Sequence, residues 1–173
     1  MSYLPPFSGY IVKPFVLLAL ILSLVACGQP EEVNYQAQAI HDEDECEVCG
    51  MLIKRFPGPK GQAIFDHKHV KFCSTRDMVA FVSDEENSHR VSDVFVHDME
   101  KTPWKAPTQD SYTDGRNAWY VTGSDQKGAM GPTFASFADK EAAQNFAQEH
   151  GGKLQTFSEL QPLQNPMAMK MKM

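Results

Sequence analysis

The sequence is poor in basic residues and in cysteine, and it has no long hydrophobic run. Its 16 lysine and arginine residues are outnumbered by 22 acidic residues, which gives a net charge of −6. An acidic chain without a basic stripe argues against binding to nucleic acid, and it gives no reason to expect electrostatic binding to lipids. The 4 cysteines include only one closely spaced pair, and the histidines do not follow zinc-finger spacing, which argues against a structural zinc knuckle.

The most hydrophobic segment runs from Phe15 to Ala26, near the N-terminus. A transmembrane helix needs about 20 apolar residues, so this shorter run is typical of the hydrophobic region of a signal peptide. It ends in L-V-A-C-G at residues 24–28, which resembles a bacterial lipobox. We therefore predict that residues 1–26 are a lipoprotein signal peptide. The Cys27 thiol would then carry the acyl chains that anchor the protein to a membrane.

Gly28, rather than aspartate, follows the acylated cysteine. By resemblance to lipoprotein sorting, this favours the periplasmic face of the outer membrane. The remaining thiols would be Cys46, Cys49 and Cys73, an odd number for an oxidising compartment. Either one pair forms a disulfide and one thiol stays free, or a metal ion keeps some of them reduced.

The first half of the chain after Cys27 alternates strand and helix signals. Residues 27–45 are acidic and weakly apolar and are predicted to form a flexible tether. The elements predicted beyond it are a hairpin of strands 62–65 and 70–73 around a polar four-residue turn at 66–69, a helix capped by Ser74, and a strand at 91–97.

The second half repeats this order. Its predicted elements are strands 118–122 and 133–137 around a glycine-rich loop, a helix capped by Asp139 and closed by Gly151 and Gly152, and a strand at 153–157. We therefore predict an α+β fold of two tandem ββαβ units. The predicted boundaries are residues 46–98 for the Cys-x-x-Cys-Gly-Met segment with the first unit, 99–116 for a linker, 117–160 for the second unit and 161–173 for a Met/Lys tail.

The segment C-E-V-C-G-M at residues 46–51 gathers soft ligands. Cys46, Cys49 and Met51 supply two thiols and a thioether within six residues. Soft sulfur donors select soft cations, above all Cu(I), whereas zinc sites use cysteine, histidine and carboxylates. Gly50 permits a bend that directs Cys49 and Met51 to one side. The alternative is that Cys49 and Met51 are core residues, since both residue types are common in protein interiors.

Other donors along the chain are open to two interpretations. Met130 lies in a loop flanked by glycines, where it is either a copper ligand or a hydrophobic plug between the two units. His67 and His69, in the polar turn, are interpreted as surface residues, although imidazole suits copper. Cys73, beside a helix N-cap, is interpreted as a small buried hydrophobic residue. The alternating methionines of residues 167–173 form either a Cu(I) trap or a frayed tail.

These motifs together resemble one family. The resembling segments, in chain order, are the lipobox at 24–27, C-E-V-C-G-M at 46–51, F-P-G-P-K-G-Q-A-I-F at 56–65, F-C-S-T-R-D-M at 72–78, A-W-Y-V-T-G-S at 118–124 and G-A-M-G-P at 128–132. The chain is similar in these segments to the NosL family, lipoprotein accessory factors for maturation of nitrous oxide reductase. The resemblance covers essentially the whole chain after the signal peptide.

The resemblance implies a periplasmic Cu(I) chaperone that helps to build the copper–sulfur centre of nitrous oxide reductase. It implies two partners, the apo form of that reductase and an associated ABC-type maturation transporter complex. It also implies a fold similar to that of the organomercurial lyase. The family's copper ligands are the cysteine and methionine of the C-G-M segment with one further donor, which correspond to Cys49 and Met51 here. Cys46 is either a third ligand or a disulfide partner of Cys49.

We therefore predict a membrane-anchored Cu(I) carrier that is not an enzyme. An alternative is a periplasmic thiol–disulfide oxidoreductase that uses Cys46 and Cys49. Such motifs normally open a helix, and Gly50 with the prolines at positions 57 and 59 argues against a helix there. A carbon–mercury lyase would rest on fold resemblance alone, and fold does not determine function.

Overall fold

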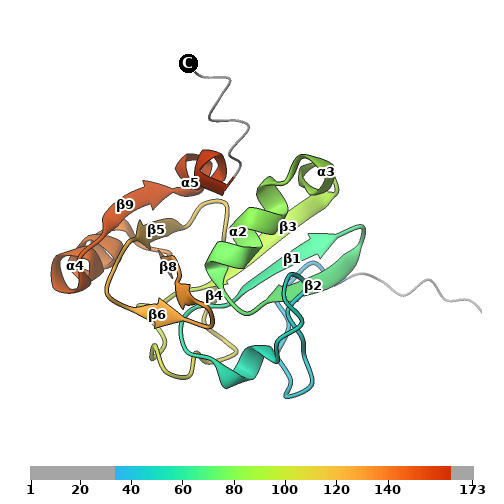
Figure 1. The fold of residues 1–173 in the computed structure, drawn as a ribbon, viewed down its shortest axis with the longest axis horizontal. Coiled ribbons are helices and arrows are strands. Elements are labelled where there is room, and N and C mark those ends of the chain that lie inside the picture. The colour runs from blue at the N-terminus through green and yellow to red at the C-terminus, as the bar shows by residue number, and fades with distance from the viewer. Residues whose placement is uncertain (1–33, 165–173) are drawn as a thin grey trace, which may run out of the picture. The chain divides into compact units, whose positions relative to one another are not determined.

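The computed structural model describes residues 34–164, with side chains described as far as Leu160. These residues form antiparallel sheets of four, three and two strands, with helices packed against the two larger ones (Figure 1). The predicted signal peptide, the predicted acylation site Cys27 and the methionine-rich segment 167–173 lie outside the described residues. Within the part that is described, no helix is long and apolar enough to cross a membrane.

The first sheet has four strands in the order β2-β1-β3-β4. Their bounds are Gly61–Phe65 for β1, Lys68–Phe72 for β2, Val91–His97 for β3 and Tyr112–Asp114 for β4. Helix α2, Thr75–Ser83, contacts β1 and β2, and the short helix α3, Glu85–Ser88, leads into β3 (Figure 1). The predicted N-cap is confirmed, because the Ser74 hydroxyl accepts a hydrogen bond from the backbone N–H of Asp77 at 3.1 Å.

The turn between β1 and β2 is shorter than predicted. Only Asp66 and His67 are unpaired, and both have positive φ angles, 47° and 62°. Two left-handed residues in succession define a tight hairpin turn whose twist matches the flanking strands. Lys68 and His69, which were assigned to the turn, instead pair with Phe65 and Ile64.

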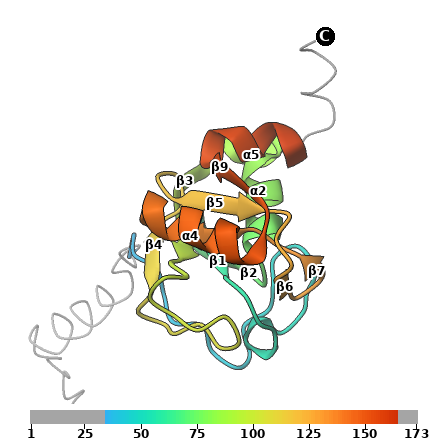
Figure 2. The same cartoon turned by 90° about the vertical axis from the view of Figure 1, so that its left-hand side faces the viewer.

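The second sheet has three strands in the order β8-β5-β9. Their bounds are Trp119–Thr122 for β5, Ala135–Phe137 for β8 and Lys153–Thr156 for β9. Helix α4, Lys140–His150, covers this sheet, and α5, Phe157–Gln164, lies beside α2 (Figure 2). The Asp139 carboxylate caps α4 by accepting the N–H groups of Glu141 and Ala142, as predicted. The loop between β5 and β8 contains a two-stranded hairpin, β6, Lys127–Gly128, and β7, Gly131–Pro132.

The predicted mixture of strands and helices is confirmed. Strand, strand, helix and strand follow one another in the order β1-β2-α2-β3 and again in the order β5-β8-α4-β9. The division into two repeated units remains an interpretation of that order. One core cluster takes residues from both sheets and from the helices: Phe72 and Val96 come from the first sheet, Tyr120 from the second, Met78 from α2 and Leu160 from α5.

Three predicted boundaries differ from the observed structure. The tether, residues 27–45, is not free in its second half: Ile40 is 4% exposed, and the backbone N–H of Gln38 donates to Gln62 Oε1 at 2.9 Å. The linker, residues 99–116, contains β4, whose backbone completes the edge of the first sheet beside β3. The tail boundary at residue 161 falls inside α5. Short apolar or polar segments such as these are ordered by tertiary pairing, which local composition does not record.

Acidification is expected to destabilise this fold through His97. The side chain is 1% exposed, and Nδ1 accepts the backbone N–H of Lys60 at 3.0 Å. Burial, assisted by the Lys60 charge, lowers the pKa of His97 to about 3. Because only the folded state favours the neutral ring, its stabilising effect is complete above about pH 6.5 and is lost as the pH falls towards 3.

The free energy of unfolding should therefore fall by about 1.4 kcal/mol per pH unit between about pH 6 and pH 4 on account of this residue alone. Denaturant unfolding followed by tryptophan fluorescence measures the slope. The His97→Gln variant should lose this part of the slope, whereas His41→Gln, at an exposed position, should keep it. An equal slope in both variants would contradict the assignment.

Candidate metal centre

The segment that carries the paired cysteines is a closed loop. The backbone N–H of Gly50 donates to Cys46 O at 2.8 Å, and the N–H of Cys46 donates to Met51 O at 3.0 Å. Gly50 has φ +67°, which glycine adopts without strain. The N–H of Glu47 donates to Lys71 O at 2.9 Å, which fixes the loop to strand β2. The loop therefore holds Cys46 and Cys49 over the end of β2.

Cys73 and Asp77 bring two further ligand atoms close to the cysteines of this loop. Cys73 follows the last residue of β2, and Asp77 lies in the first turn of α2. The Ser74 cap fixes where α2 begins, so Asp77 comes one helical turn after Cys73. The Cys73 thiol donates to Asp77 Oδ2, with 3.3 Å between sulfur and oxygen. The end of β2 and the first turn of α2 therefore place Cys73 and Asp77 next to the loop cysteines.

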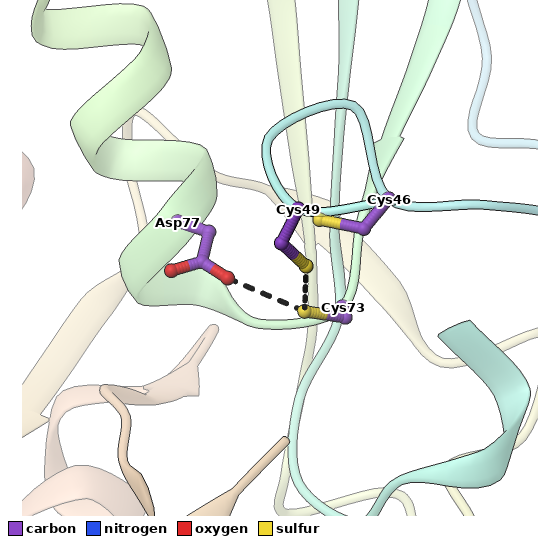
Figure 3. A group of neighbouring side chains, drawn as sticks. All are labelled: Cys46, Cys49, Cys73 and Asp77. Carbon is purple, nitrogen blue, oxygen red and sulfur yellow. Dashed lines mark hydrogen bonds between the residues drawn. The ribbon is translucent and has the colours of Figure 1, made fainter. Parts of the chain in front are cut away.

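The ligand atoms of Cys46, Cys49, Cys73 and Asp77 all lie within 4.8 Å of one another (Figure 3). The sulfur atoms of Cys49 and Cys73 are 3.6 Å apart, and the three cysteines are free thiols rather than disulfides. Cys46, Cys73 and Asp77 are buried, whereas Cys49 is half-buried. The cluster is therefore closed on its inner side and is reached through Cys49.

The three cysteines of the cluster differ in pKa: that of Cys46 is lowered, whereas those of Cys49 and Cys73 are raised. The neighbouring Cys73 side chain, helped by the backbone N–H groups of Cys73, Cys49 and Val48, lowers the pKa of Cys46 to about 5, against the opposing effect of burial. The pKa of Cys73 is raised, because its proton is held in hydrogen bonds and the site is buried. Burial also raises the pKa of Cys49. Cys46 is therefore the thiol of the cluster that loses its proton most readily, and the thiolate is the form that binds metal.

Sequence reasoning missed half of this cluster. Cys73 is buried, as predicted, but it is not isolated among apolar residues, since its sulfur faces Cys49 and Asp77. Asp77 was not among the ligands predicted from the sequence. The available signal was the spacing itself: a cap at Ser74 places Asp77 on the helix turn next to Cys73. What the spacing did not contain was the pairing of Glu47 with Lys71, which brings the Cys46–Cys49 loop to that place.

The other ligands considered from the sequence, Met51, Met130, His67 and His69, are not members of this four-residue cluster. Met51 is half-buried and packs, like Cys49, against the main core cluster. Met130 is 53% exposed in the turn between β6 and β7, so it does not plug the core. His67 is exposed and its Nδ1 is hydrogen-bonded to Tyr35 Oη, whereas His69 is half-buried in β2 and its Nε2 is hydrogen-bonded to Asn34 O. Along the described stretch, the cluster of Figure 3 is the group in which three or more cysteine, histidine or acidic ligand atoms converge.

The spacing of the sulfur atoms suits a single small soft ion. Two metal–sulfur bonds of about 2.3 Å separate the sulfurs by about 3.8 Å at a tetrahedral angle and about 4.6 Å when linear. The 3.6 Å between the sulfurs of Cys49 and Cys73 and the 4.8 Å upper limit for all four ligand atoms bracket this range. Three thiols with one carboxylate favour a thiophilic metal over Mg²⁺ or Ca²⁺, which bind oxygen ligands.

The fold and the cluster define a small α+β protein with a thiol-rich candidate metal site that is half-open to the surface at Cys49. A family model described as NosL matches residues 37–164. The chain belongs to the NosL family, which confirms the resemblance found in the sequence motifs.

Curated relatives and a solved structure support this assignment. The copper-binding lipoprotein NosL of Stutzerimonas stutzeri is 43% identical over 148 residues, which cover 83% of this chain and 78% of the relative. The copper-binding lipoprotein NosL of Achromobacter cycloclastes is 27% identical over 152 residues, covering 84% and 79%. The crystal structure of the copper chaperone NosL from Shewanella denitrificans superposes with a TM-score of 0.71 at 48% identity, over 73% of this chain and 96% of that chain.

Proposed function

We propose that this protein is a periplasmic, membrane-anchored Cu(I) chaperone that delivers copper for assembly of the copper–sulfur centre of nitrous oxide reductase. It carries its metal as cargo and has no catalytic activity. The observation that carries the proposal is the convergence of three thiols on one spot, with one of them half-buried. The names of the relatives, copper-binding lipoprotein and copper chaperone, indicate that the metal is copper.

The proposed ligands are Cys49 and Met51, with Cys46 and Met130 as further donors. The geometry adds Cys73, whose sulfur lies 3.6 Å from that of Cys49. Thiolate and thioether sulfur both prefer Cu(I) to harder cations. Met51, two residues after Cys49, is half-buried and packs against the main core cluster, whereas Met130 is exposed. In this proposal Met51 holds the ion together with Cys49, and Met130 would bind it on its way in or out.

The partial exposure of Cys49 gives the ion a route to another protein. A Cu(I) ion bound by two or three sulfurs can accept an incoming ligand before it loses an old one. The receiving protein can therefore take the ion without its release into water. We propose that the receiver is the apo form of nitrous oxide reductase, working with an ABC-type maturation transporter complex.

Attachment to the membrane would come from acyl chains on Cys27. Each buried methylene contributes about 0.8 kcal/mol, so several chains anchor a protein firmly. Gly28 favours the outer membrane, which would place the copper site in the periplasm. Globomycin treatment of producing cells, followed by electrophoresis, tests the anchor: accumulation of an uncleaved precursor supports it, and its absence argues for an ordinary secretory signal.

An anaerobic titration tests the copper-binding step. The delipidated, reduced protein is expected to withdraw one Cu(I) per chain from a chromophoric chelator, because one cluster of thiols is available. X-ray absorption should give sulfur as the dominant neighbour. The same protein lacking residues 167–173 is the control and should bind the same number of ions with the same affinity. Failure of the full chain to compete with the chelator would refute the proposal.

A thiol–disulfide oxidoreductase is a second candidate, supported by the 3.6 Å separation of the Cys49 and Cys73 sulfurs. Against it stands the local structure, because residues 46–51 form a loop and no helix begins at Cys46. Cys46, the thiol whose pKa is lowered, is also only 3% exposed and is poorly placed to attack a substrate disulfide. Catalysed reduction of insulin disulfides by the copper-free protein would favour this candidate over the chaperone.

A further inference from the structure

Cys49 and Cys73 are two free thiols in direct contact. Their sulfur atoms are 3.6 Å apart (Figure 3). A disulfide bond is about 2.05 Å long, so the two sulfurs have to approach by about 1.6 Å to form one. The hydrogen bond from Glu47 N–H to Lys71 O lies two residues before each cysteine and holds the two backbone segments together. The fold therefore brings this pair close to bonding distance.

The thiols of the cluster differ in their access to solvent. Cys49 is half-buried, whereas Cys46 is 3% exposed and Cys73 is fully buried. A dissolved oxidant therefore meets the cluster first at Cys49. Directly behind that sulfur lies the sulfur of Cys73. An accessible thiol next to a second, resolving thiol is the arrangement of a redox-sensitive cysteine pair.

A carboxylate lies beside the second thiol. Cys73 Sγ donates to Asp77 Oδ2, with 3.3 Å between the two atoms. Asp77 is 7% exposed, and its backbone N–H donates to Ser74 Oγ, which fixes it in the first turn of α2. Cys73 has to lose its proton when its sulfur forms a new bond. Asp77 is placed to accept that proton.

We propose that Cys49 and Cys73 form a redox switch, a disulfide of the copper-free protein that closes the site to copper until it is reduced. The inference rests on the proposed copper-binding function. The sequence pairs Cys49 with Cys46 in a C-x-x-C motif, but the sulfur contact observed for Cys49 is with Cys73. The disulfide removes two of the three thiols and leaves Cys46 as a single buried sulfur donor.

The oxidant is a disulfide compound, and the reaction is thiol–disulfide exchange. The Cys49 thiol loses its proton to water, and its thiolate attacks one sulfur of the oxidant, which gives a mixed disulfide and releases one thiol. Cys73 Sγ then attacks Cys49 Sγ, its proton passes to Asp77, and the second thiol leaves. Two electrons pass from the two cysteines to the oxidant. Burial raises the pKa of Cys49, which slows the first step but does not prevent the exchange.

Oxidation of the reduced, copper-free protein by oxidised glutathione tests the proposal. Cys27→Ser serves as the background, so that Cys46, Cys49 and Cys73 are the remaining thiols. We expect a thiol assay to show the loss of two thiols per chain. After alkylation, cleavage at Glu47 and at the basic residues that follow Cys49 separates the three cysteines. Mass spectrometry should then find Cys49 joined to Cys73, and Cys46 alkylated.

Copper binding should follow the state of this disulfide. Chelator competition is expected to show Cu(I) affinity lower by on the order of 1000-fold in the oxidised protein, because thiolates are the ligands and two are lost. Reduction by a phosphine should restore the affinity. Protein loaded with Cu(I) before glutathione is added should keep its thiols, since metal-bound thiolates are not free to attack the oxidant.

Two variants separate the steps. Cys73→Ala should retain glutathione on Cys49, because the thiol that displaces it is missing. Cys46→Ala is the matched control: it removes a buried thiol from the same cluster and should still form the Cys49–Cys73 disulfide. Near-UV circular dichroism of the reduced variants reports whether the fold is intact. If a variant does not fold, the disulfide found in the background protein decides the question.

Three results would overturn the switch: no loss of thiols, glutathione retained on Cys49 while Cys73 is present, or a disulfide that includes Cys46. Full Cu(I) affinity in the oxidised protein would overturn it as well. A reduced protein that does not bind Cu(I) would instead refute the proposed chaperone function. The disulfide is mapped without copper, so the two failures are distinguishable.

Discussion

Replacement of Cys49 by serine is expected to weaken Cu(I) binding by about 1000-fold, a loss of about 4 kcal/mol. Cys49 is the half-buried member of the cluster, and its sulfur is within 4.8 Å of the ligand atoms of Cys46, Cys73 and Asp77. A serine hydroxyl is a hard, neutral oxygen donor that Cu(I) disfavours. Cys73→Ser should cause a loss of similar size if Cys73 binds the ion, as its 3.6 Å separation from Cys49 suggests.

The measurement is competition with a chromophoric Cu(I) chelator under anaerobic conditions. Cys27→Ser is the matched control, because it removes a thiol that lies outside the cluster and should alter membrane attachment without altering copper affinity. Denaturant unfolding of the copper-free variants separates lost ligation from lost structure. Undiminished affinity in a folded Cys49→Ser would exclude Cys49 as a ligand and would move the site to other donors.

Local sequence signals predicted the elements around the site well. The Ser74 and Asp139 caps were recognisable because a short polar side chain before an apolar helix satisfies free backbone N–H groups. The strand from Val91 to His97 was predicted with its observed bounds, because alternating and β-branched residues are typical of a half-buried strand. These features depend on residues only a few positions apart.

The parts that the sequence did not predict depend on contacts between distant residues. Ile40 is anchored by Gln109, whose side chain bonds the backbone N–H and carbonyl of Ile40. Strand β4 exists because it pairs with β3. Cys73 joins the site through the docking of Glu47 on Lys71. None of these contacts leaves a periodic pattern, so composition alone suggested a tether, a linker and an isolated core cysteine.

Gly61→Ala is expected to destabilise the protein by about 3 kcal/mol, a large effect for the addition of one methyl group. A Cβ at position 61 would lie 2.5 Å from Met78 Sδ and 2.6 Å from Met78 Cβ. The Met78 thioether could rotate away, but its Cβ is fixed to α2 and can move only with the helix. Met78 is fully buried, so α2 would have to shift away from β1.

The same shift should weaken copper binding, because α2 carries Asp77 next to Met78 and begins directly after Cys73 and Ser74. Denaturant unfolding followed by tryptophan fluorescence measures the stability loss, and chelator competition measures the change in affinity. Lys68→Ala, at an exposed position on the same hairpin, should change stability by no more than about 0.5 kcal/mol. An unfolding midpoint of Gly61→Ala equal to that of the wild type would contradict this prediction. It would mean that the close packing of α2 on β1 does not position Cys73 and Asp77.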